Sequence, residues 1–433
     1  MARVLPTHQP GTSAQARTAL LLLFLAYALS ITDRMILSVL IEPIRLEFGA
    51  SDTQMGLLGG LSFALFYATL GVPIAKLADR ADRRLIIVCS LALFSLMTAL
   101  SGAAVSFLAL FLLRIGVGIG EAGVNPASQS IIADYYPQER RGTAMSVLAV
   151  GAPVGMIGGF LVGGAVSEAY GWRMALIAVG LPGLVLAGVI YFLLREPSRG
   201  AADGPVAATG PAPSVMHSAT FMFTTPALRQ LLIASTLTGM MSYGASTWLP
   251  TFFVRTHALS QSEVGLIMAL LFGGLGAVGT LVGGRLFDVV SRKGAERGVW
   301  MIGIVQLTTI PFSLLAYQAG SFSLAILLLV LPAFAGNFFL GPVLALIQTL
   351  SPVPMRAVAA AIKMLCLNLV GLSLGPLIVG LISDQLKTEL GDASIGIALS
   401  VLALLHLWSA LHFWLCGRAM QKSQAAIKSD FST

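Results

Sequence analysis

Apolar residues occur along this chain in long blocks, and charged residues or Pro/Gly breaks separate one block from the next. A helix needs about twenty apolar residues to cross roughly 30 Å of hydrocarbon, because it rises about 1.5 Å per residue. The pattern therefore predicts an all-α membrane protein. Twelve helical spans are expected, near residues 18–46, 53–76, 85–105, 107–134, 141–167, 172–194, 227–254, 262–286, 298–319, 322–350, 357–384 and 393–417.

The composition excludes an ordinary soluble domain. Of the 433 residues, 56% are hydrophobic and only 10% are charged, and the mean hydropathy is +0.87. Soluble domains carry about 25% charged residues. The three cysteines lie far apart in or beside apolar spans, so they predict neither a disulfide framework nor a metal site: Cys89, Cys366 and Cys416. His406 and His412 lack the spacing of a helical zinc pair, and we expect no cofactor or metal.

The chain divides near its middle. The least apolar stretch between spans is 196–226, which contains GPVAATGPAP and is typical of a linker. We therefore expect two six-helix bundles, 1–195 and 227–433, joined by this cytoplasmic linker. The first fifteen or so residues lack the apolar core of a cleaved signal peptide, so the first span is expected to direct insertion.

Positive charge predicts the orientation of the spans. With both termini and the linker inside, 19 Lys and Arg lie on the inner side. Only four lie outside, at Arg45, Arg173, Arg255 and Lys387. Cytoplasmic loops carry such an excess, so both termini are predicted to be cytoplasmic. The net charge of +7 is then a topology signal and does not indicate nucleic-acid binding. Compactness and short loops favour a bacterial source, so we expect a multi-pass protein of a bacterial inner membrane. We also expect a monomer.

The two halves repeat each other. AKLADRADRR at 75–84 recurs as GRLFDVVSRK at 284–293. The fourth span matches the tenth at a constant offset of 216, which pairs Gly120 with Gly336 and Pro126 with Pro342. Such parallel repeats imply a central cavity near the midplane, opened alternately by rocking one half on the other.

Several motifs resemble those of the major facilitator superfamily. They are the loop at 75–84, RIGVGIGEA at 114–122 and GAPVGMIGG at 151–159. Within that superfamily the chain is similar to the spinster family of lysolipid and sphingolipid transporters. This closer resemblance lies in TDR at 32–34, GVGIGEA at 116–122, SIIADYYPQERRGTAMS at 130–146, APVG at 152–155 and LREPSRGA at 194–201. It implies a transporter of two six-helix bundles and a substrate-binding role for the first-helix arginine, Arg34.

Five ionisable side chains lie inside apolar spans: Asp33, Arg34, Arg114, Glu121 and Lys363. Each disfavours insertion by about 2.5–3.5 kcal/mol at a helix centre, so they should pair or face water. Arg114 and Glu121 are seven residues apart, or about 10 Å along one helix face, which is too far for direct contact. We expect the first span to supply their partners, with Asp33–Arg114 as the preferred pair.

These charges are candidates for proton coupling. Burial disfavours a charged carboxylate and a nearby arginine favours it, so small movements can change its protonation. We expect Asp33 and Glu121 to carry protons, with Arg114 and Arg34 as partners. Static salt bridges between the first and fourth helices are the alternative. The residue equivalent to Glu121 in the second half is Asn337, which cannot titrate, so the proton site is expected in the first half.

Substrate contacts are predicted on both halves. Arg34 could grip an anionic head group such as phosphate bidentately, beside Glu121. Lys363 could add a second positive point, or its side chain could instead snorkel to the cytoplasmic end. The cavity wall is expected to include residues of the seventh, tenth and eleventh spans, although aromatic residues there also commonly face lipid or other helices: Tyr243, Trp248, Asn337, Phe338, Phe339 and Asn368.

Gating is expected from small residues and from the inner loops. Glycines recur at four-residue spacing in 151–164 and 273–284, which allows helices to approach closely. Pro153 is a candidate kink. The charged loops are expected to form inner-face ion pairs, each worth under about 1 kcal/mol if exposed, unless they serve topology alone: Asp79, Arg83, Arg84, Asp288 and Arg292.

The sequence thus predicts a proton-coupled transporter that exports an amphipathic lipid-like substrate, such as a lysophospholipid or a sphingoid lipid. Its partners would be that substrate, protons and the bilayer. Three alternatives stay open: a proton/drug antiporter, a facilitator without proton coupling, and a membrane-embedded ligand sensor. No catalytic constellation is recognisable, so an enzyme is not expected.

Overall fold

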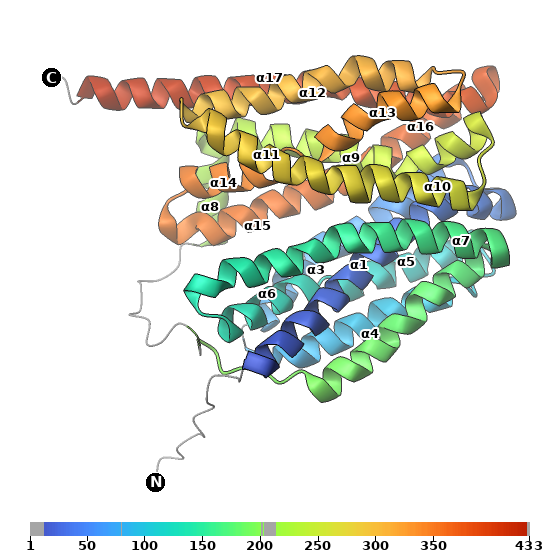
Figure 1. Cartoon of the computed structure of the whole chain (residues 1–433), viewed down its shortest axis with the longest axis horizontal. Coiled ribbons are helices and arrows are strands. Elements are labelled where there is room, and N and C mark those ends of the chain that lie inside the picture. Colours follow the sequence, from blue (N-terminus) through green and yellow to red (C-terminus); the bar gives the residue numbers. More distant parts are fainter. Residues whose placement is uncertain (1–12, 79, 201, 203–213, 431–433) are drawn as a thin grey trace, which may run out of the picture. The chain divides into compact units, whose positions relative to one another are not determined.

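The computed structural model describes residues 13–78, 80–200, 202 and 214–430, and all regular elements in these ranges are helices. Contacts divide the chain into two compact units, which are described separately. Unit 1 contains 1–37 and 65–209, and unit 2 contains 38–64 and 210–433. The first helix, α1, runs from Ser13 to Phe48 and contributes to both units (Figure 1).

Unit 1 is built from the first part of α1 and the helices up to residue 193. A glycine turns the longest of them back on itself: Gly171 has φ 83°, which favours glycine, and it separates two helical arms of α7. The helices that follow α1 in this unit are α3 (Ser62–Ala78), α4 (Arg83–Ser101), α5 (Phe107–Glu121), α6 (Val124–Tyr135) and α7 (Gln138–Leu193).

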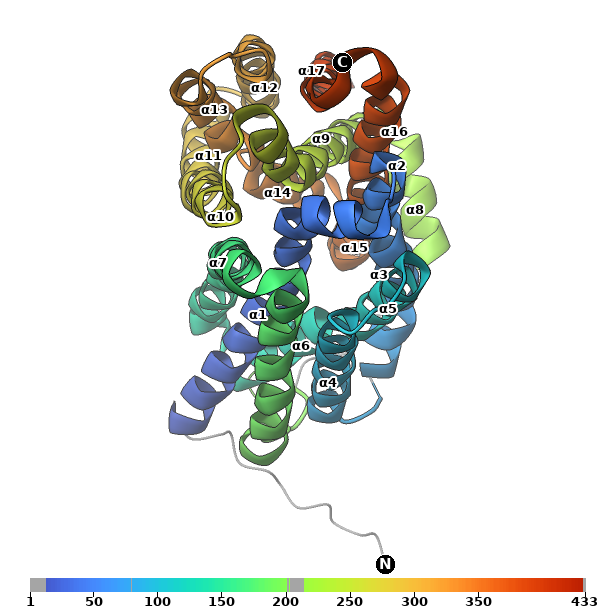
Figure 2. The ribbon, with the colours of Figure 1, turned by 90° about the vertical axis from the view of Figure 1, so that its right-hand side faces the viewer.

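Unit 2 contains residues 38–64, which belong to the first two predicted spans, and all the helices of the second half. In Figure 2, α2 lies against α16, although their sequences are over 300 residues apart. The elements are α2 (Asp52–Gly56), η1 (Leu57–Leu61), α8 (Val215–Thr224), α9 (Pro226–His257), α10 (Gln261–Met268), η2 (Ala269–Leu275), α11 (Gly276–Ser291), α12 (Ala295–Tyr317), α13 (Phe322–Gly336), α14 (Leu340–Leu350), η3 (Val353–Met355), α15 (Arg356–Cys366), η4 (Leu367–Leu372), α16 (Ser373–Leu390), η5 (Gly391–Ala393) and α17 (Ser394–Asp430).

The predicted spans fall on helices throughout the described chain. Nine helical stretches in the described ranges are long and apolar enough to cross a membrane. Two of these stretches each contain more than one predicted span, because helices follow one another without a loop: 138–193 and 358–422. The span predicted at 227–254 lies on α9, which is outside those nine.

Helix breaks support the internal repeat. The fourth predicted span breaks between Glu121, where α5 ends, and Val124, where α6 begins. The tenth breaks between Gly336, where α13 ends, and Leu340, where α14 begins. The start of α6 and the start of α14 are separated by the same offset of 216 that aligns the sequences. Both halves therefore interrupt the same helix at the same place.

Glycines bring α1 and α7 together inside unit 1. A Cβ added at Gly155 or Gly159 would collide with the backbone of Ala28 or Thr32 on α1. The Thr32 hydroxyl also donates a hydrogen bond to the Gly155 carbonyl at 3.0 Å. This confirms the close approach expected from the glycine run at 151–164, and it fixes the part of α1 that precedes Asp33.

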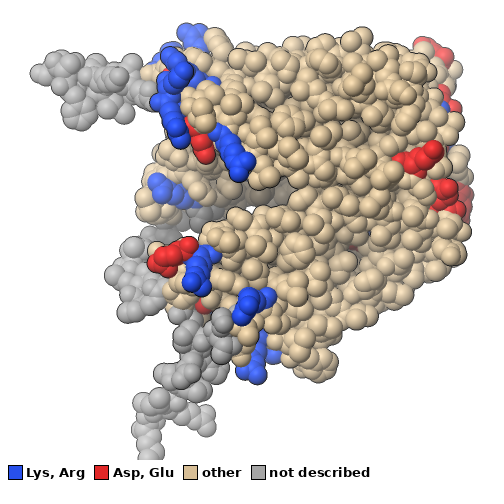
Figure 3. Space-filling model, viewed as in Figure 1, with Lys and Arg blue, Asp and Glu red and all other residues tan. Residues whose placement is uncertain are grey.

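Charged side chains collect at the helix ends of each unit. On the face seen in Figure 3, most Lys and Arg lie toward one end of the helices, and uncharged residues cover the middle. This is the distribution expected of helices that cross a bilayer.

Candidate functional site

Asp33 and Arg114 form a buried ion pair in unit 1. Arg114 Nη1 donates to Asp33 Oδ2 at 3.1 Å, and the Thr98 hydroxyl donates to Asp33 Oδ1. Both charged residues are buried, at 1% and 2% exposure. The pair predicted between the first and fourth spans is therefore confirmed, and α4 contributes the additional hydroxyl.

Glu121 is the second buried carboxylate and pairs with Arg34. Its Oε2 accepts hydrogen bonds from Arg34 Nε at 2.7 Å and from the Ser30 hydroxyl at 2.9 Å. Arg34 Nη2 also lies 2.7 Å from Oε2. In contrast, Oε1 is buried without a hydrogen-bond partner among the described residues. One oxygen of this carboxylate is thus held by a cation, while the other is unsatisfied.

The position of Glu121 follows from the helix break. It is the last residue of α5, and its side chain has no exposed surface. Arg34 approaches it from α1, and its guanidinium lies 4.4 Å from the centre of the Tyr67 ring on α3. Burial opposes the negative charge of Glu121, whereas Arg34 favours it. Because these two influences oppose each other, the protonation of Glu121 depends on its distance from Arg34.

Lys363 lies in unit 2, on α15. It is 2% exposed, so most of its side chain is buried inside the unit.

The other predicted substrate residues differ in their surroundings. Trp248 is fully buried, and its indole N–H donates to the Pro376 carbonyl at 2.8 Å, which favours a packing role. Phe338 and Phe339 are also buried. Asn368 is half-buried and donates to Met364 of its own helix at 2.9 Å. Tyr243 and Asn337 are half-buried.

A cavity of about 60 Å³ lies inside unit 2 between α9, η2, α12, α13 and α17. Its wall is mostly apolar, but Gln306, Thr309 and Ser313 give α12 a polar stripe. The cavity has room for a few waters or a short piece of chain, since one water needs only about 10–15 Å³ measured in this way. It does not hold a whole amphiphile. None of the substrate residues predicted from the sequence lines it.

Unit 1 carries a buried arginine at the end that is predicted to be cytoplasmic. Arg83 Nε lies 2.6 Å from Glu196, and its Nη1 lies 2.5 Å from Asp134 and 2.8 Å from Ser130. The Arg83 side chain is 1% exposed, so the small energy given above for exposed ion pairs does not apply to this residue. The backbone N–H of Arg84 donates to Glu196 at 3.2 Å. Burial strengthens these pairs because water no longer screens them.

The remaining gating candidates lie in less constrained places. Asp288 and Arg292 are exposed and make no ion pair within the described ranges. Asp79 lies outside the described residues. Pro153 lies within the first arm of α7.

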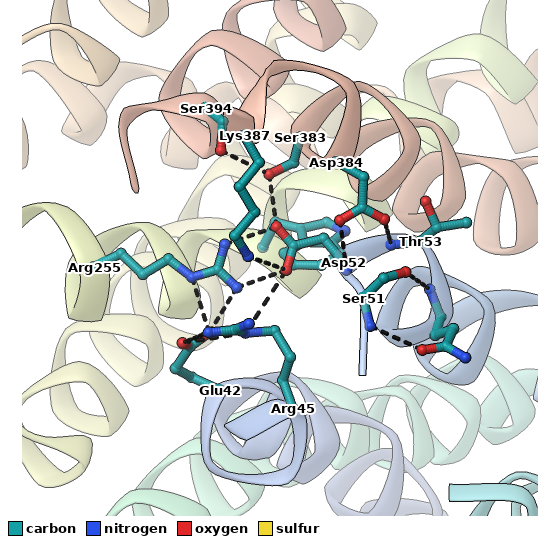
Figure 4. A network of polar contacts seen from close by, with 12 residues as sticks. Glu42, Arg45, Ser51, Asp52, Thr53, Arg255, Ser383, Asp384, Lys387 and Ser394 are labelled. Atoms are coloured by element: carbon teal, nitrogen blue, oxygen red, sulfur yellow. Dashed lines mark hydrogen bonds and ion pairs between the residues drawn. The ribbon is translucent and has the colours of Figure 1, made fainter. Parts of the chain in front are cut away.

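The sequence reasoning missed a network of charges in unit 2, at the helix ends that the charge bias predicts to lie outside (Figure 4). Asp52, which has no exposed surface, accepts two hydrogen bonds of 2.7 Å from Arg255 and one of 2.7 Å from Ser383. Arg255 also binds Glu42 at 2.8 Å, and Glu42 binds Arg45 at 2.7 Å. We call this set, with Asp384 and Lys387, the outer network.

Asp384, on α16, joins the outer network through the backbone of α2. Its carboxylate accepts from the N–H groups of Asp52 at 2.9 Å and Thr53 at 2.7 Å, at the start of α2 (Figure 4). Beside it, a Cβ at Gly56 would lie 2.6 Å from the Pro376 carbonyl. The start of α2 is thus held against α16 by hydrogen bonds and by close backbone packing.

A signal for the outer network was present in the sequence. Arg45, Arg255 and Lys387 are three of the four cations on the predicted outer side. Cations there run against the usual bias and indicate a specific partner.

Comparison with known proteins identifies the family of the chain. The sequence model of the Major Facilitator Superfamily matches residues 23–376. The chain belongs to the major facilitator superfamily. This superfamily member is 33% identical over 405 residues to an MFS-type efflux pump of Mycolicibacterium smegmatis, covering 93% of this chain and 92% of that protein. It is 30% identical over 380 residues to a probable L-galactonate transporter of Escherichia coli, covering 85% and 83%.

Among solved structures, the chain is similar to a bacterial homologue of the human lysosomal transporter Spinster in an inward-facing, unoccupied conformation. The two share 28% of residues with a TM-score of 0.87, over 95% of this chain and 99% of that one. The resemblance to spinster proteins inferred from the motifs is confirmed, and the chain is an integral, multi-pass membrane protein of a transporter superfamily.

Proposed function

We propose that the protein is a proton-coupled secondary transporter that works by alternating access. In this proposal twelve spans form two six-helix bundles, 1–195 and 227–433, with both termini in the cytoplasm of a bacterium. The charge bias of the loops and the matching helix breaks at 121–124 and 336–340 support this arrangement. The protein acts as a monomer in the cell membrane.

The observation that carries proton coupling is the unequal environment of the two Glu121 oxygens. Oε2 is bound to Arg34 and Ser30, whereas Oε1 is buried without a partner among the described side chains. A proton on Oε1 removes the charge of Glu121 and so weakens its attraction for Arg34. Arg34 is then released toward a substrate, and loss of the proton restores the pair. Asp33, held by Arg114 and Thr98, is the second carrier in this scheme.

The outer network is proposed as the outer gate. It joins residues 42–53 to Arg255 and to Asp384, and these groups must separate for the outer side to open. Removing one partner of a buried ion pair destabilises it by about 3–5 kcal/mol, so the network favours the closed state strongly. At the inner side, Arg83, Asp134 and Glu196 are candidates for a corresponding gate, together with Arg84, Asp288 and Arg292.

The substrate is proposed to be an amphipathic lipid-like molecule, exported from the cell, such as a lysophospholipid or a sphingoid lipid. The likeness to spinster proteins supports this, as does Arg34, whose guanidinium suits a phosphate head group. Export of hydrophobic drugs is the second candidate, because a relative covering 93% of this chain is an efflux pump. Facilitated transport without protons and a sensor role are the remaining alternatives.

Transport into proteoliposomes tests the proposal. A panel of lysolipids, sphingoid lipids and hydrophobic drugs is offered to the parent protein with and without a pH gradient. We expect one lipid-like member to accumulate only with the gradient, and Asp33→Asn to reduce that accumulation. If the pH gradient changes the transport of the drugs only, the result would favour a proton/drug antiporter. Downhill flux that ignores the gradient would contradict proton coupling.

A further inference from the structure

Lys363 is a buried cation without a counter-ion. It lies on α15, two helical turns from Arg356, and its side chain is 2% exposed. Across residues 13–78, 80–200, 202 and 214–430 it forms no ion pair and no side-chain hydrogen bond. An ammonium group in such a place has little access to water and no counter-ion in the described protein, and burial then disfavours its charge.

The other embedded charges cannot balance it. Asp33 pairs with Arg114, and Glu121 pairs with Arg34, so these four sum to zero inside unit 1. Of the five Asp, Glu, Lys and Arg side chains that lie away from the ends of the predicted spans, Lys363 is left with an uncompensated positive charge.

The carboxylates of the second half lie at the ends of its helices. On the continuation of α15 the next carboxylate is Asp384, which is 21 residues from Lys363 and so about 30 Å along the helix axis. Asp384 already binds two backbone N–H groups of α2. Glu263 is likewise engaged in capping the start of α10. Within the described second half, no Asp or Glu forms an ion pair with Lys363.

The backbone next to Lys363 is π-helical, as it is in η1 and η2. The π-helical segment η4, Leu367–Leu372, begins one turn after Lys363. Such segments occur frequently at functional sites because the extra residue in the turn redirects side chains.

We propose that Lys363 binds an oxyanion, phosphate or carboxylate, carried by the transported amphiphile. This inference rests on the proposed function and narrows its substrates to anions. A neutral or cationic compound would leave Lys363 unpaired, and so it would bind less well. Lys363 is in this sense a specificity-determining residue. The same chemistry is present in anionic lipids of the bilayer, which the experiment must separate from substrate.

Binding to the purified full-length protein in a neutral detergent tests the charge preference. The probes are lysophosphatidic acid and a monoacylglycerol with the same chain, which differ by the phosphate. We expect the parent to bind the anionic probe about ten- to hundred-fold more tightly, the range for one charge-assisted contact. Lys363→Met should reduce that difference by about ten-fold or more, leaving only the contribution of Arg34, and Lys363→Arg should keep most of it. Lys293→Met, at an exposed lysine, is the matched control and should match the parent.

Several results would overturn the inference. Equal binding of the two probes by the parent would do so, and so would an unchanged preference in Lys363→Met. If Lys363→Met does not fold, the parent and Lys363→Arg still test the inference, because both must prefer the anionic probe. Displacement of the anionic probe by phosphatidylglycerol at equal affinity would mean that a bilayer lipid occupies the site. If the parent prefers the anionic probe but a pH gradient has no effect on transport, anion binding by Lys363 is supported and proton coupling is refuted.

Discussion

Neutralising Asp52 should open the outer side of the protein. Asp52→Asn keeps the shape of the side chain but leaves the three cations of the outer network facing two carboxylates: Arg45, Arg255 and Lys387 against Glu42 and Asp384. Loss of one partner from a buried ion pair amounts to about 3–5 kcal/mol. Arg255 retains Glu42 at 2.8 Å, so the lower end of that range applies. At about 1.4 kcal/mol per factor of ten, the equilibrium should shift about hundred-fold toward opening.

The shift is measured by the reactivity of a cysteine placed at Thr247 in a cysteine-free background. Thr247 is buried, and a Cβ at Gly59 of η1 would lie 3.2 Å from its methyl group. When the segment that carries Asp52 and Gly59 moves away, this position becomes accessible to a membrane-impermeant maleimide added outside. We expect labelling to accelerate by at least about ten-fold in Asp52→Asn, within the shift estimated above.

Two further variants make this test sharper. Ser383→Ala removes one hydrogen bond to Asp52 without changing charge, and it should give a smaller increase. Asp392→Asn changes an exposed carboxylate in η5 and should label like the parent. If Asp52→Asn is folded and monodisperse but labels at the parental rate, the outer network does not hold the outer side closed.

Two further variants concern stability, measured by thermal unfolding in detergent. Gly155→Leu should destabilise the protein by about 1–3 kcal/mol, because a side chain there collides with α1, whereas Gly188→Leu on the open face of the same helix should not. Equal effects would refute the close packing of α1 on α7. Arg83→Gln should lower stability by about 3–5 kcal/mol, since it leaves Asp134 and Glu196 without their cation. Arg292→Gln, at the matching but exposed position of the repeat, should change it by less than about 0.5 kcal/mol, and a comparable loss would contradict a special role for Arg83.

The embedded charges were predictable because they are few. With five ionisable groups in apolar spans, Arg114 had only two carboxylates as possible partners, and one of them lay too far along its own helix. The structure places Asp33 against Arg114 and Glu121 against Arg34. The contribution of Thr98 was not predictable, since a hydroxyl in an apolar helix is commonly bonded to its own backbone.

The outer network could not be derived from the sequence in the same way. Glu42 and Asp52 lie near span ends, where carboxylates are common and usually exposed. Their partners Arg255 and Asp384 follow more than 200 residues later, and pairing over that distance depends on the tertiary fold. Similarly, the burial of Arg83 results from α6 and the segment after α7 closing over the loop, which no local pattern indicates.

The central claim is that Glu121 couples transport to protons, and one measurement tests it most directly. Glu121→Gln in proteoliposomes is assayed for uphill accumulation driven by a pH gradient and for exchange of labelled against unlabelled substrate without a gradient. We expect accumulation to be lost and exchange to persist. The neutral amide still accepts a hydrogen bond from Arg34, but it does not take up or release a proton during transport. Glu139→Gln, at an exposed glutamate, should behave like the parent. Undiminished gradient-driven accumulation by Glu121→Gln would contradict the account.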